Sequence, residues 1–276
     1  MAMQPITLTS GMRANLVSLQ NTNSLLETTQ KRLASGKKVN SALDDPVAYF
    51  TAVNHEQRAS DLASRKDEMS ESVQTIKAAN SGIESINTLI AAAKSLATSA
   101  LSADSTTAET LMAQFNTVRT QIDEMADDSG YKGVNLLGGT DVSLTVKFDE
   151  LGVSKLGITG FDGSTEGLSI GEATGWVSGS SVVASQIEAA VIDLDDAKNT
   201  LRTESSKLAN NLSIITARQE FTQGMINVLK DGAASLTNAD MNEEGANMLM
   251  LQTRQSLGTT SLSLASQAAQ AVLRLF

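Results

Sequence analysis

The stretch ANMLMLQTRQSLGTTSLSLASQAAQAVLRLF, residues 246–276, governs how this chain can fold. Large apolar residues recur in it once per heptad, at Met250, Leu257 and Leu264, and Ala271 continues the line. One large apolar residue in seven is too little to stabilise an isolated helix in water. The other faces carry small or uncharged side chains, which let neighbouring backbones approach closely. We therefore expect this helix to become ordered by assembly with other helices.

The first long segment has a related heptad pattern with polar residues at alternate seam positions. Its seam positions are spaced alternately three and four: Leu16, Leu19, Asn23, Leu26, Gln30 and Leu33. Polar seam residues can fix the register and the number of partners at some cost in stability. The alternative is a half-exposed amphipathic helix without such a role. Ser35-Gly36 predicts the end of the helix.

Three further helices are predicted between these ends. Asp45 can cap a helix that Pro46 opens, and this helix is expected to run to about Ala103. Its apolar stripe is Met69, Val73, Ile76, Ala79, Ile83, Ile86, Ile90, Ala93, Ala97 and Leu101. Thr106 and Glu109 form a candidate capping box for a helix that should fold back antiparallel. Helical periodicity resumes from Ile187 to Leu229, and a link from Asp231-Gly232 leads to the last helix.

The middle of the chain lacks the helical periodicity of the rest. Residues 129–139 are rich in glycine, and Val142, Leu144, Val146 and Phe148 alternate with polar residues as in a half-buried strand. We interpret residues 130–181 as a small β-hairpin and loop region at the far end of the rod. The predicted fold class is therefore mainly α, a long antiparallel helical rod or coiled coil with paired N- and C-terminal helices.

Composition narrows the classes of function. The formal net charge of −10 disfavours binding to nucleic acid and to anionic membranes. Aromatic residues make up only 3 % of the chain and there are 2 prolines, which favours long uninterrupted helices over an enzyme-like core. No apolar run approaches the roughly 20 residues that a membrane span needs. Residues 1–10 do not read as a secretory signal peptide, so export would need another route.

The sequence offers few residues for a metal site or a catalytic site. The chain has no cysteine, and His55 is its only histidine, in a polar helical stretch that is typical of a surface histidine. The acidic pairs Asp127-Asp128 and Asp195-Asp196 lack calcium-loop spacing and read as solvated helix faces. Glycines 130–139 lack the ending of a phosphate-binding loop and read as turn residues. We predict no cofactor and no active site.

Several stretches in this order resemble bacterial flagellin over nearly all of the chain. They are LASGKKVNSALDDP (33–46), GVNLLG (133–138), Asn238-Ala239-Asp240, Ser256-Leu257-Gly258-Thr259-Thr260, Leu264, Gln267-Ala268 and the ending VLRLF (272–276). Each stretch alone is weak evidence. Their joint order at both ends is specific to flagellins and their hook-associated relatives.

The resemblance implies a filament subunit of the bacterial flagellum with an extracellular location. Residues 1–45 plus 237–276 would form a terminal coiled-coil domain lining the filament core, and residues 46–236 a surrounding rod-like domain. The implied partners are other copies of the chain, the flagellar cap and hook-associated proteins, an export chaperone and the type III export apparatus. The predicted polymerisation seams contain Leu16, Leu19, Leu26, Leu33, Met250, Leu257, Leu264 and Leu275.

The resemblance also points to a motif that a toll-like receptor uses in enteric flagellins, Arg-x-Arg-Glu-Leu-Ala. Here the stretch reads Ala92-Ala-Lys94-Ser95-Leu96-Ala97, so Ala92 and Ser95 replace an arginine and an acid. Because a charged contact is lost at each of these positions, we predict weak receptor recognition.

Two other functions stay open. A hook-filament junction protein shares the terminal pattern, but it would be scarce and would not form long filaments alone. A surface-binding module could bind a glycan or host molecule with the glycine-rich residues 150–181, where the lone Trp176 is the best candidate contact. A lone tryptophan is, however, more often part of the local core.

Overall fold

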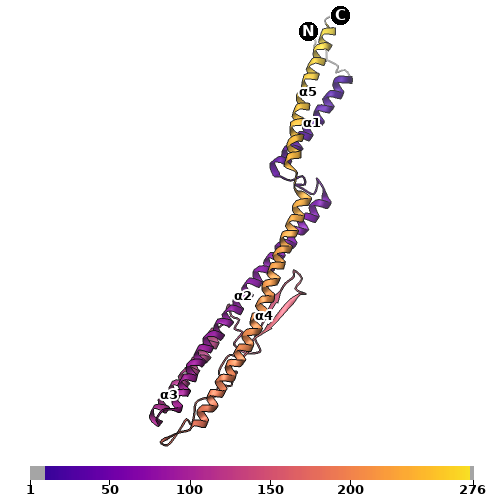
Figure 1. Ribbon diagram of the computed structural model, residues 1–276. Helices are drawn as coiled ribbons and strands as arrows, with labels where there is room; N and C mark the ends of the chain where they lie inside the picture. The colour runs from indigo at the N-terminus through magenta and orange to yellow at the C-terminus, as the bar shows by residue number, and fades with distance from the viewer. Residues whose placement is uncertain (1–9, 274–276) are drawn as a thin grey trace. The chain divides into compact units, whose positions relative to one another are not determined.

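Five helices and four short strands make up the fold of the computed structural model, which describes residues 10–273 (Figure 1). Their order is α1 (Ser10–Ser35), α2 (Pro46–Leu101), α3 (Ser105–Asp128), β1 (Ser143–Lys147), β2 (Lys155–Thr159), β3 (Val177–Ser178), β4 (Ser181–Val182), α4 (Ala184–Thr237) and α5 (Met241–Leu273). The mainly α fold class is confirmed. The chain divides into unit 1, residues 1–57 and 228–276, and unit 2, residues 58–227.

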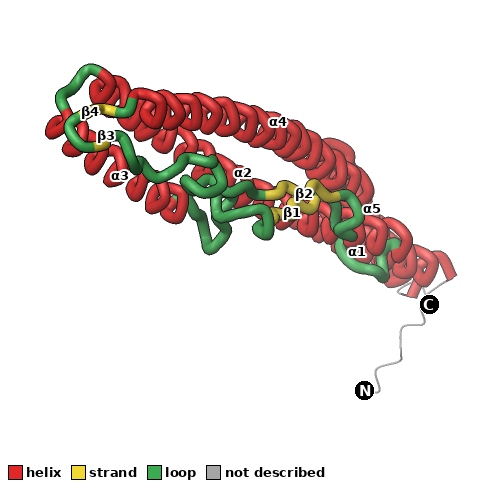
Figure 2. The backbone as a smooth tube through the Cα atoms, turned by 90° about the horizontal axis from the view of Figure 1, so that it is seen from below, coloured by secondary structure: helices red, strands yellow, loops and turns green. Residues whose placement is uncertain are grey.

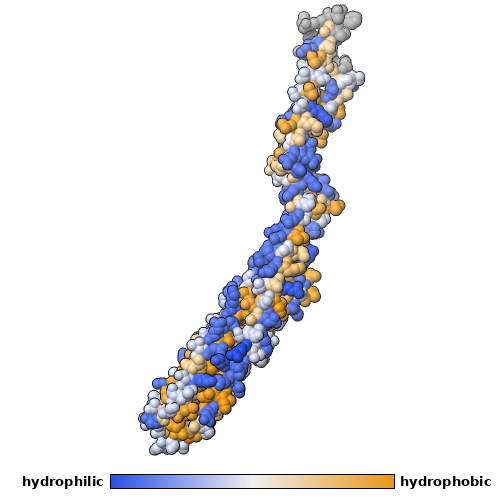
Figure 3. All heavy atoms as spheres, in the orientation of Figure 1, coloured by the Kyte–Doolittle hydropathy of each residue, from blue (hydrophilic) through white to orange (hydrophobic). Residues whose placement is uncertain are grey.

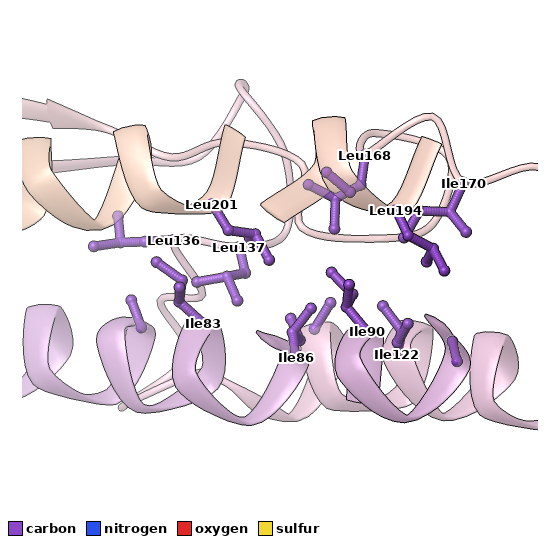
Figure 4. Close-up of a cluster of buried hydrophobic side chains, with 14 of the residues drawn as sticks. Ile83, Ile86, Ile90, Ile122, Leu136, Leu137, Leu168, Ile170, Leu194 and Leu201 are labelled. Atoms are coloured by element: carbon purple, nitrogen blue, oxygen red, sulfur yellow. The ribbon is translucent and has the colours of Figure 1, made fainter. Parts of the chain in front are cut away.

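The core of unit 2 is built on the predicted apolar stripe of α2. Every member of that stripe is buried except Leu101, which lies at the end of the helix. Ile83, Ile86 and Ile90 of α2 point toward α4, whose Leu194 and Leu201 point back (Figure 4). Residues of α3 and of the following loops complete the cluster: Ile122, Leu136, Leu137, Leu168 and Ile170. Because the stripe repeats every three or four residues, one face of each helix is enough to bury it.

The start of α3 differs from the predicted capping box. Asp104 is the N-cap, and its side chain accepts a hydrogen bond from the backbone N–H of Thr107 at 2.7 Å. This bond lowers the pKa of Asp104 below its ordinary value. An aspartate one residue before the helix reaches the free N–H groups of the first turn, so Thr106 stays inside the helix.

Residues 129–176 lie alongside the helices of unit 2 and do not form the expected tip (Figure 2). Asn116, Arg119 and Asp123 of α3, spaced three and four apart, bind the backbone of this segment. The Asn116 amide exchanges hydrogen bonds with the backbone of Ala173, Arg119 Nε donates to the carbonyl of Ile170, and Asp123 accepts from the N–H of Thr165. Only the β3–β4 ribbon, directly before α4, lies at the end of unit 2.

A tight turn anchors the start of this segment to α2. Lys132 and Gly133 both have positive φ, and Tyr131 and Val134 exchange two backbone hydrogen bonds, as in a two-residue hairpin turn. Glu71 of α2 accepts hydrogen bonds from Lys132 Nζ at 2.6 Å and from the Tyr131 hydroxyl at 3.1 Å. These donors, Lys132 first, lower the pKa of Glu71. The prediction that the glycines here serve turns is confirmed.

The connections of unit 1 pair with each other. Gly36 has a φ of 70° and ends α1, as predicted. The N–H groups of Lys38 and Val39 donate to the carbonyl of Thr237, and the N–H of Ala239 donates to the carbonyl of Gly36. Asp45 caps α2 by accepting from the N–H of Ala48 at 3.0 Å. In contrast to the expected link, α4 continues through Gly232 to Thr237.

Gly82 of α2 gives the first test of this packing. A Cβ at Gly82 would lie 2.0 Å from Ser129 Oγ and 2.6 Å from Ser129 Cβ. We expect Gly82→Ala to lower the free energy of unfolding by about 1–3 kcal/mol, as overpacking does, measured by urea unfolding. Gly224→Ala in α4 is the control, because a Cβ at Gly224 would meet nothing within 4 Å and alanine favours a helix. Equal stabilities of the two variants would contradict this close packing.

Candidate functional site

Helices α1 and α5 form an antiparallel pair in unit 1 (Figure 1). Polar contacts join the described parts of these two helices. Arg32 Nη1 lies 3.0 Å from Glu244 Oε1, Gln255 Nε2 donates to Asn23 Oδ1 at 2.7 Å, and Asn15 Nδ2 donates to Ser261 Oγ at 3.3 Å. As the residue number falls along α1 it rises along α5. The three contacts therefore set one antiparallel register.

The surface between the two helices has a thin apolar seam. Its buried or half-buried positions on α1 include Met12, Asn15, Leu19, Thr22, Leu26, Thr29 and Leu33. Those on α5 include Glu244, Met248, Leu251, Gln255, Gly258, Leu262, Ala265 and Ala269. Met12 and Leu251 are the only fully buried hydrophobic side chains in these two sets. Such a seam stabilises the pair weakly, because hydrophobic stabilisation is proportional to the apolar area buried.

Gly258 lets the two backbones approach. A Cβ at this position would lie 2.6 Å from Leu19 Cδ2, so Leu19 fills the space that any other residue would occupy. Thr22, opposite this part of α5, satisfies its hydroxyl by donating to the carbonyl of Ser18 in its own helix. The closest part of the pair is therefore a leucine seated against a glycine.

The predicted polymerisation seams divide between two faces. Leu19, Leu26 and Leu33 are half-buried in the α1–α5 seam, whereas Leu16 is 40 % exposed. Met250, Leu257 and Leu264 are 50, 66 and 61 % exposed and lie on the side of α5 away from α1. Leu275 lies outside the described residues. The row of α5 that faces α1 was not predicted from the sequence. Its members repeat at the same three-four spacing: Met248, Leu251, Gln255, Gly258 and Leu262.

The outer face of α5 has the chemistry of a surface that other chains cover. Leu249 is also exposed, and no charged residue occurs between Gln255 and Leu273. At 100° per residue, Met250, Leu257 and Leu264 form one line along the helix. The exposed Arg254 lies beside this row between Met250 and Leu257, and no charged residue follows it up to Leu273. An exposed row of large apolar side chains marks an interaction site in a monomeric protein.

A second exposed apolar group in unit 1 was not predicted. Leu43, Val47 and Phe50 are exposed and follow one another at helical spacing from the α1–α2 connection into α2. Asp44 lies beside them, and the backbone N–H groups of Asn40 and then Ser41 lower its pKa. The spacing of four and three in the sequence is the signal that would have identified this group.

The described residues provide little for metal or catalytic chemistry. Within 10–273 no group of three or more His, Cys, Asp or Glu side chains is placed to hold a metal ion. His55 is half-buried. Asp127 and Asp128 are exposed, and Asp195 is paired with Lys94 at 2.5 Å. Among the same described helices, none is long and apolar enough to cross a membrane.

The structure places the two predicted recognition sites, Trp176 and the receptor-like motif, differently. Trp176 is buried and packs against Phe115 with ring centroids 5.0 Å apart, so it belongs to the core and is not the exposed ligand contact that a surface-binding module would need. The motif that resembles the receptor site lies on α2 with Ala92 and Ser95 exposed and Leu96 half-buried. Lys94 there is engaged with both carboxylate oxygens of Asp195, at 2.5 and 2.8 Å.

Long helices and an exposed row of large apolar side chains on α5 are the features of a helical structural protein that associates with other chains. Comparison with known proteins leads to the same class of protein. Residues 8–141 match the family described as "Bacterial flagellin N-terminal helical region". The chain belongs to the flagellin family and is a structural subunit of the bacterial flagellar filament.

Relatives of this family align over the whole chain. Flagellin FljK of Caulobacter vibrioides is 27 % identical over 278 residues, with 100 % of both chains covered. The flagellin of Brucella melitensis is 27 % identical over 282 residues, with 99 % of both chains covered. The crystal structure of Bacillus cereus flagellin has a TM-score of 0.47 and 15 % identity, covering 56 % of this chain and 88 % of that chain. The hook-filament junction alternative is not favoured.

Leu251 and Leu257 provide a matched test of the two faces of α5. We expect Leu251→Ala to lower the hydrogen-exchange protection of residues 241–271, because removing a buried leucine side chain costs about 2–5 kcal/mol. Leu257→Ala removes the same atoms from an exposed position and should leave the protection of the monomer unchanged. Protection lost equally in both variants would refute the assigned faces.

Proposed function

We propose that copies of this chain polymerise by covering the outer face of α5, formed by Leu249, Met250, Leu257 and Leu264. The single observation that supports this is the exposed apolar line on a helix that carries no charged residue between Gln255 and Leu273. Leu16 of α1 and Leu275 would extend the contact. Leu19, Leu26 and Leu33 would instead hold α1 on α5, so that the helix pair enters the filament as one element.

In this proposal residues 1–45 plus 237–276 line the filament core and residues 46–236 form the surrounding rod. Fully burying a leucine or methionine contributes about 1.5–3 kcal/mol, and these side chains are 50 to 68 % exposed, so each would add roughly half to two-thirds of that. Association also costs several kcal/mol of lost freedom. A stable polymer therefore needs the contact to be repeated along each helix and between many copies.

Membership in the flagellin family supports further parts of the proposal. The chain would be extracellular, after export through the flagellar type III apparatus with an export chaperone and without a cleaved signal. Its other partners would be the flagellar cap and hook-associated proteins. The proposal includes no enzymatic activity, no cofactor, no nucleic acid and no membrane insertion.

Paired leucine substitutions test the polymerisation surface. We expect Leu257→Ala/Leu264→Ala to raise the critical concentration for filament assembly at least about tenfold, because roughly 1.4 kcal/mol of lost contact gives that factor. Sedimentation of seeded assemblies measures it, with Ser256→Ala/Ser263→Ala as the control one position earlier on the helix. Filaments formed at the wild-type concentration by this variant, or by a chain ending at Thr237, would refute the proposal.

We also propose that the flagellin-sensing toll-like receptor recognises this chain weakly. Ala92 and Ser95 are exposed but uncharged, and Lys94 is bound by Asp195. We expect Ala92→Arg/Ser95→Glu to raise potency in a cell reporter assay, since it supplies the charged contacts that hot spots use. Ala91→Arg/Ser99→Glu, at exposed positions of the same helix outside the motif, is the control. A wild-type potency equal to that of an enteric flagellin would refute weak recognition.

A further inference from the structure

Methionine is the residue type of this chain most open to oxidation. The sequence has 10 methionines and no cysteine, the other residue type whose sulfur peroxides oxidise. Among the described residues only Met241 and Met250 are exposed methionines, at 47 and 50 %, and both lie in α5. Because a peroxide must reach the sulfur, these two would react first. The other described methionines are buried or half-buried: Met12, Met69, Met112, Met125, Met225 and Met248.

The two exposed methionines lie on opposite sides of α5. They are nine residues apart, which at about 100° per residue places them roughly 180° apart around the helix. Met250 begins the exposed row that Leu257 and Leu264 continue. Met241 is the first residue of the helix and lies outside this row. Figure 3 shows apolar side chains between hydrophilic ones on the surface of the α1–α5 pair. Oxidation at the two positions would therefore alter different surfaces.

The free chain can hold an oxidised Met250 without losing its fold. Met250 lies on the side of α5 away from α1, and the residues three and four positions further along, Thr253 and Arg254, are exposed. Water can therefore solvate the sulfoxide oxygen, which is more polar than the thioether sulfur that it replaces. Met248 differs, because it is half-buried in the seam with α1 and its oxidation would act on the helix pair.

A peroxide converts the thioether of Met250 into a sulfoxide in one two-electron step. A lone pair of Sδ attacks one oxygen of hydrogen peroxide, the O–O bond breaks and an S–O bond forms. The hydroxide that leaves takes the proton of the transferred oxygen and becomes water, so sulfur is oxidised and the peroxide is reduced. In methionine sulfoxide reductases two thiols reverse the step and give back the thioether, a disulfide and water.

We propose that Met250 is an oxidation site that controls entry of the free chain into the polymer. This inference rests on the proposed covering of the outer face of α5 by other copies. Apolar side chains can cover a thioether in the row, but a sulfoxide buried there loses its water without gaining a partner, which costs free energy. A peroxide therefore blocks the free chain, and reduction restores it. Once a copy has assembled, its neighbours shield Met250 from the oxidant.

Peroxide treatment of the full-length monomer tests the site. Hydrogen peroxide is added until peptide mass spectrometry shows conversion of Met250 to the sulfoxide, and is then removed. We expect the critical concentration for assembly to rise roughly tenfold or more, and a methionine sulfoxide reductase with dithiothreitol to restore it. Met250→Leu keeps an apolar side chain of similar volume that peroxide does not oxidise, so this variant should assemble equally well before and after treatment. The matched control Met241→Leu should stay as sensitive as the wild-type chain.

Glutamine variants give a readout that does not depend on peroxide. Met250→Gln places a polar amide in the row and should raise the critical concentration roughly tenfold, whereas Met241→Gln should leave it unchanged. Glutamine and methionine have similar helix propensities, and circular dichroism verifies that each variant is folded. Assembly of Met250→Gln at the wild-type concentration overturns the inference. Equal loss of assembly by treated Met250→Leu and treated wild-type chain overturns it as well.

Oxidation of preformed filaments separates a failure of this inference from a failure of the proposed function. We expect Met250 to be converted severalfold more slowly in filaments than in the monomer, because neighbouring copies cover it. Equal rates would mean that the outer face of α5 stays uncovered, so the proposed function would fail together with this inference. Slow conversion in filaments, combined with normal assembly of the oxidised monomer, would overturn this inference alone.

Discussion

The burial of one apolar stripe on α2 against α4 is the interaction on which the rest of unit 2 depends. Buried apolar residues follow one another along the stripe from Met69 to Ala100. The residues of α4 in the same buried cluster are Ile187, Leu194, Leu201, Leu208 and Ile215. Both helices are far longer than a globular average, so neither would be stable in water without this shared surface. The remaining parts of unit 2 pack on the apolar surface that α2 and α4 leave uncovered.

Helix α3 and the loops after it cover that uncovered side. Phe115 and Ile122 of α3 complete the core, and Trp176 fills the space beside Phe115. The polar side of α3 then binds loop backbone, so that Asn116, Arg119 and Asp123 satisfy groups that would otherwise be buried without partners. A segment with little secondary structure of its own is ordered in this way, and it carries the β1–β2 hairpin.

Unit 1 contrasts with this dense core. Its α1–α5 seam contains threonine, asparagine, glutamine and glycine where unit 2 has isoleucine and leucine. The apolar residues that could strengthen the pair, Met250, Leu257 and Leu264, lie on the other side of α5. The distribution suits a filament subunit, because apolar area kept out of the monomer core is available for contacts between copies. A terminal pair packed as densely as unit 2 would have less to gain from assembly.

The sequence by itself determined the helices, because a stripe such as Met69 to Ala97 repeats at the helical period and a cap such as Asp45-Pro46 is local chemistry. It also determined the family, since the matching motifs occur in order at both ends. Tertiary structure alone decided which face of α5 meets α1. Two apolar rows repeat at helical spacing on this helix, and only the contacts of Gly258 with Leu19 and of Gln255 with Asn23 show which row faces α1. It likewise decided that residues 129–176 run along the helices and bury Trp176, since those contacts join residues 42 to 57 positions apart along the chain and the loop side of each contact follows no helical or strand period. Periodic patterns show which faces of a helix are apolar, but the folded chain decides which of those faces is buried and against which partner.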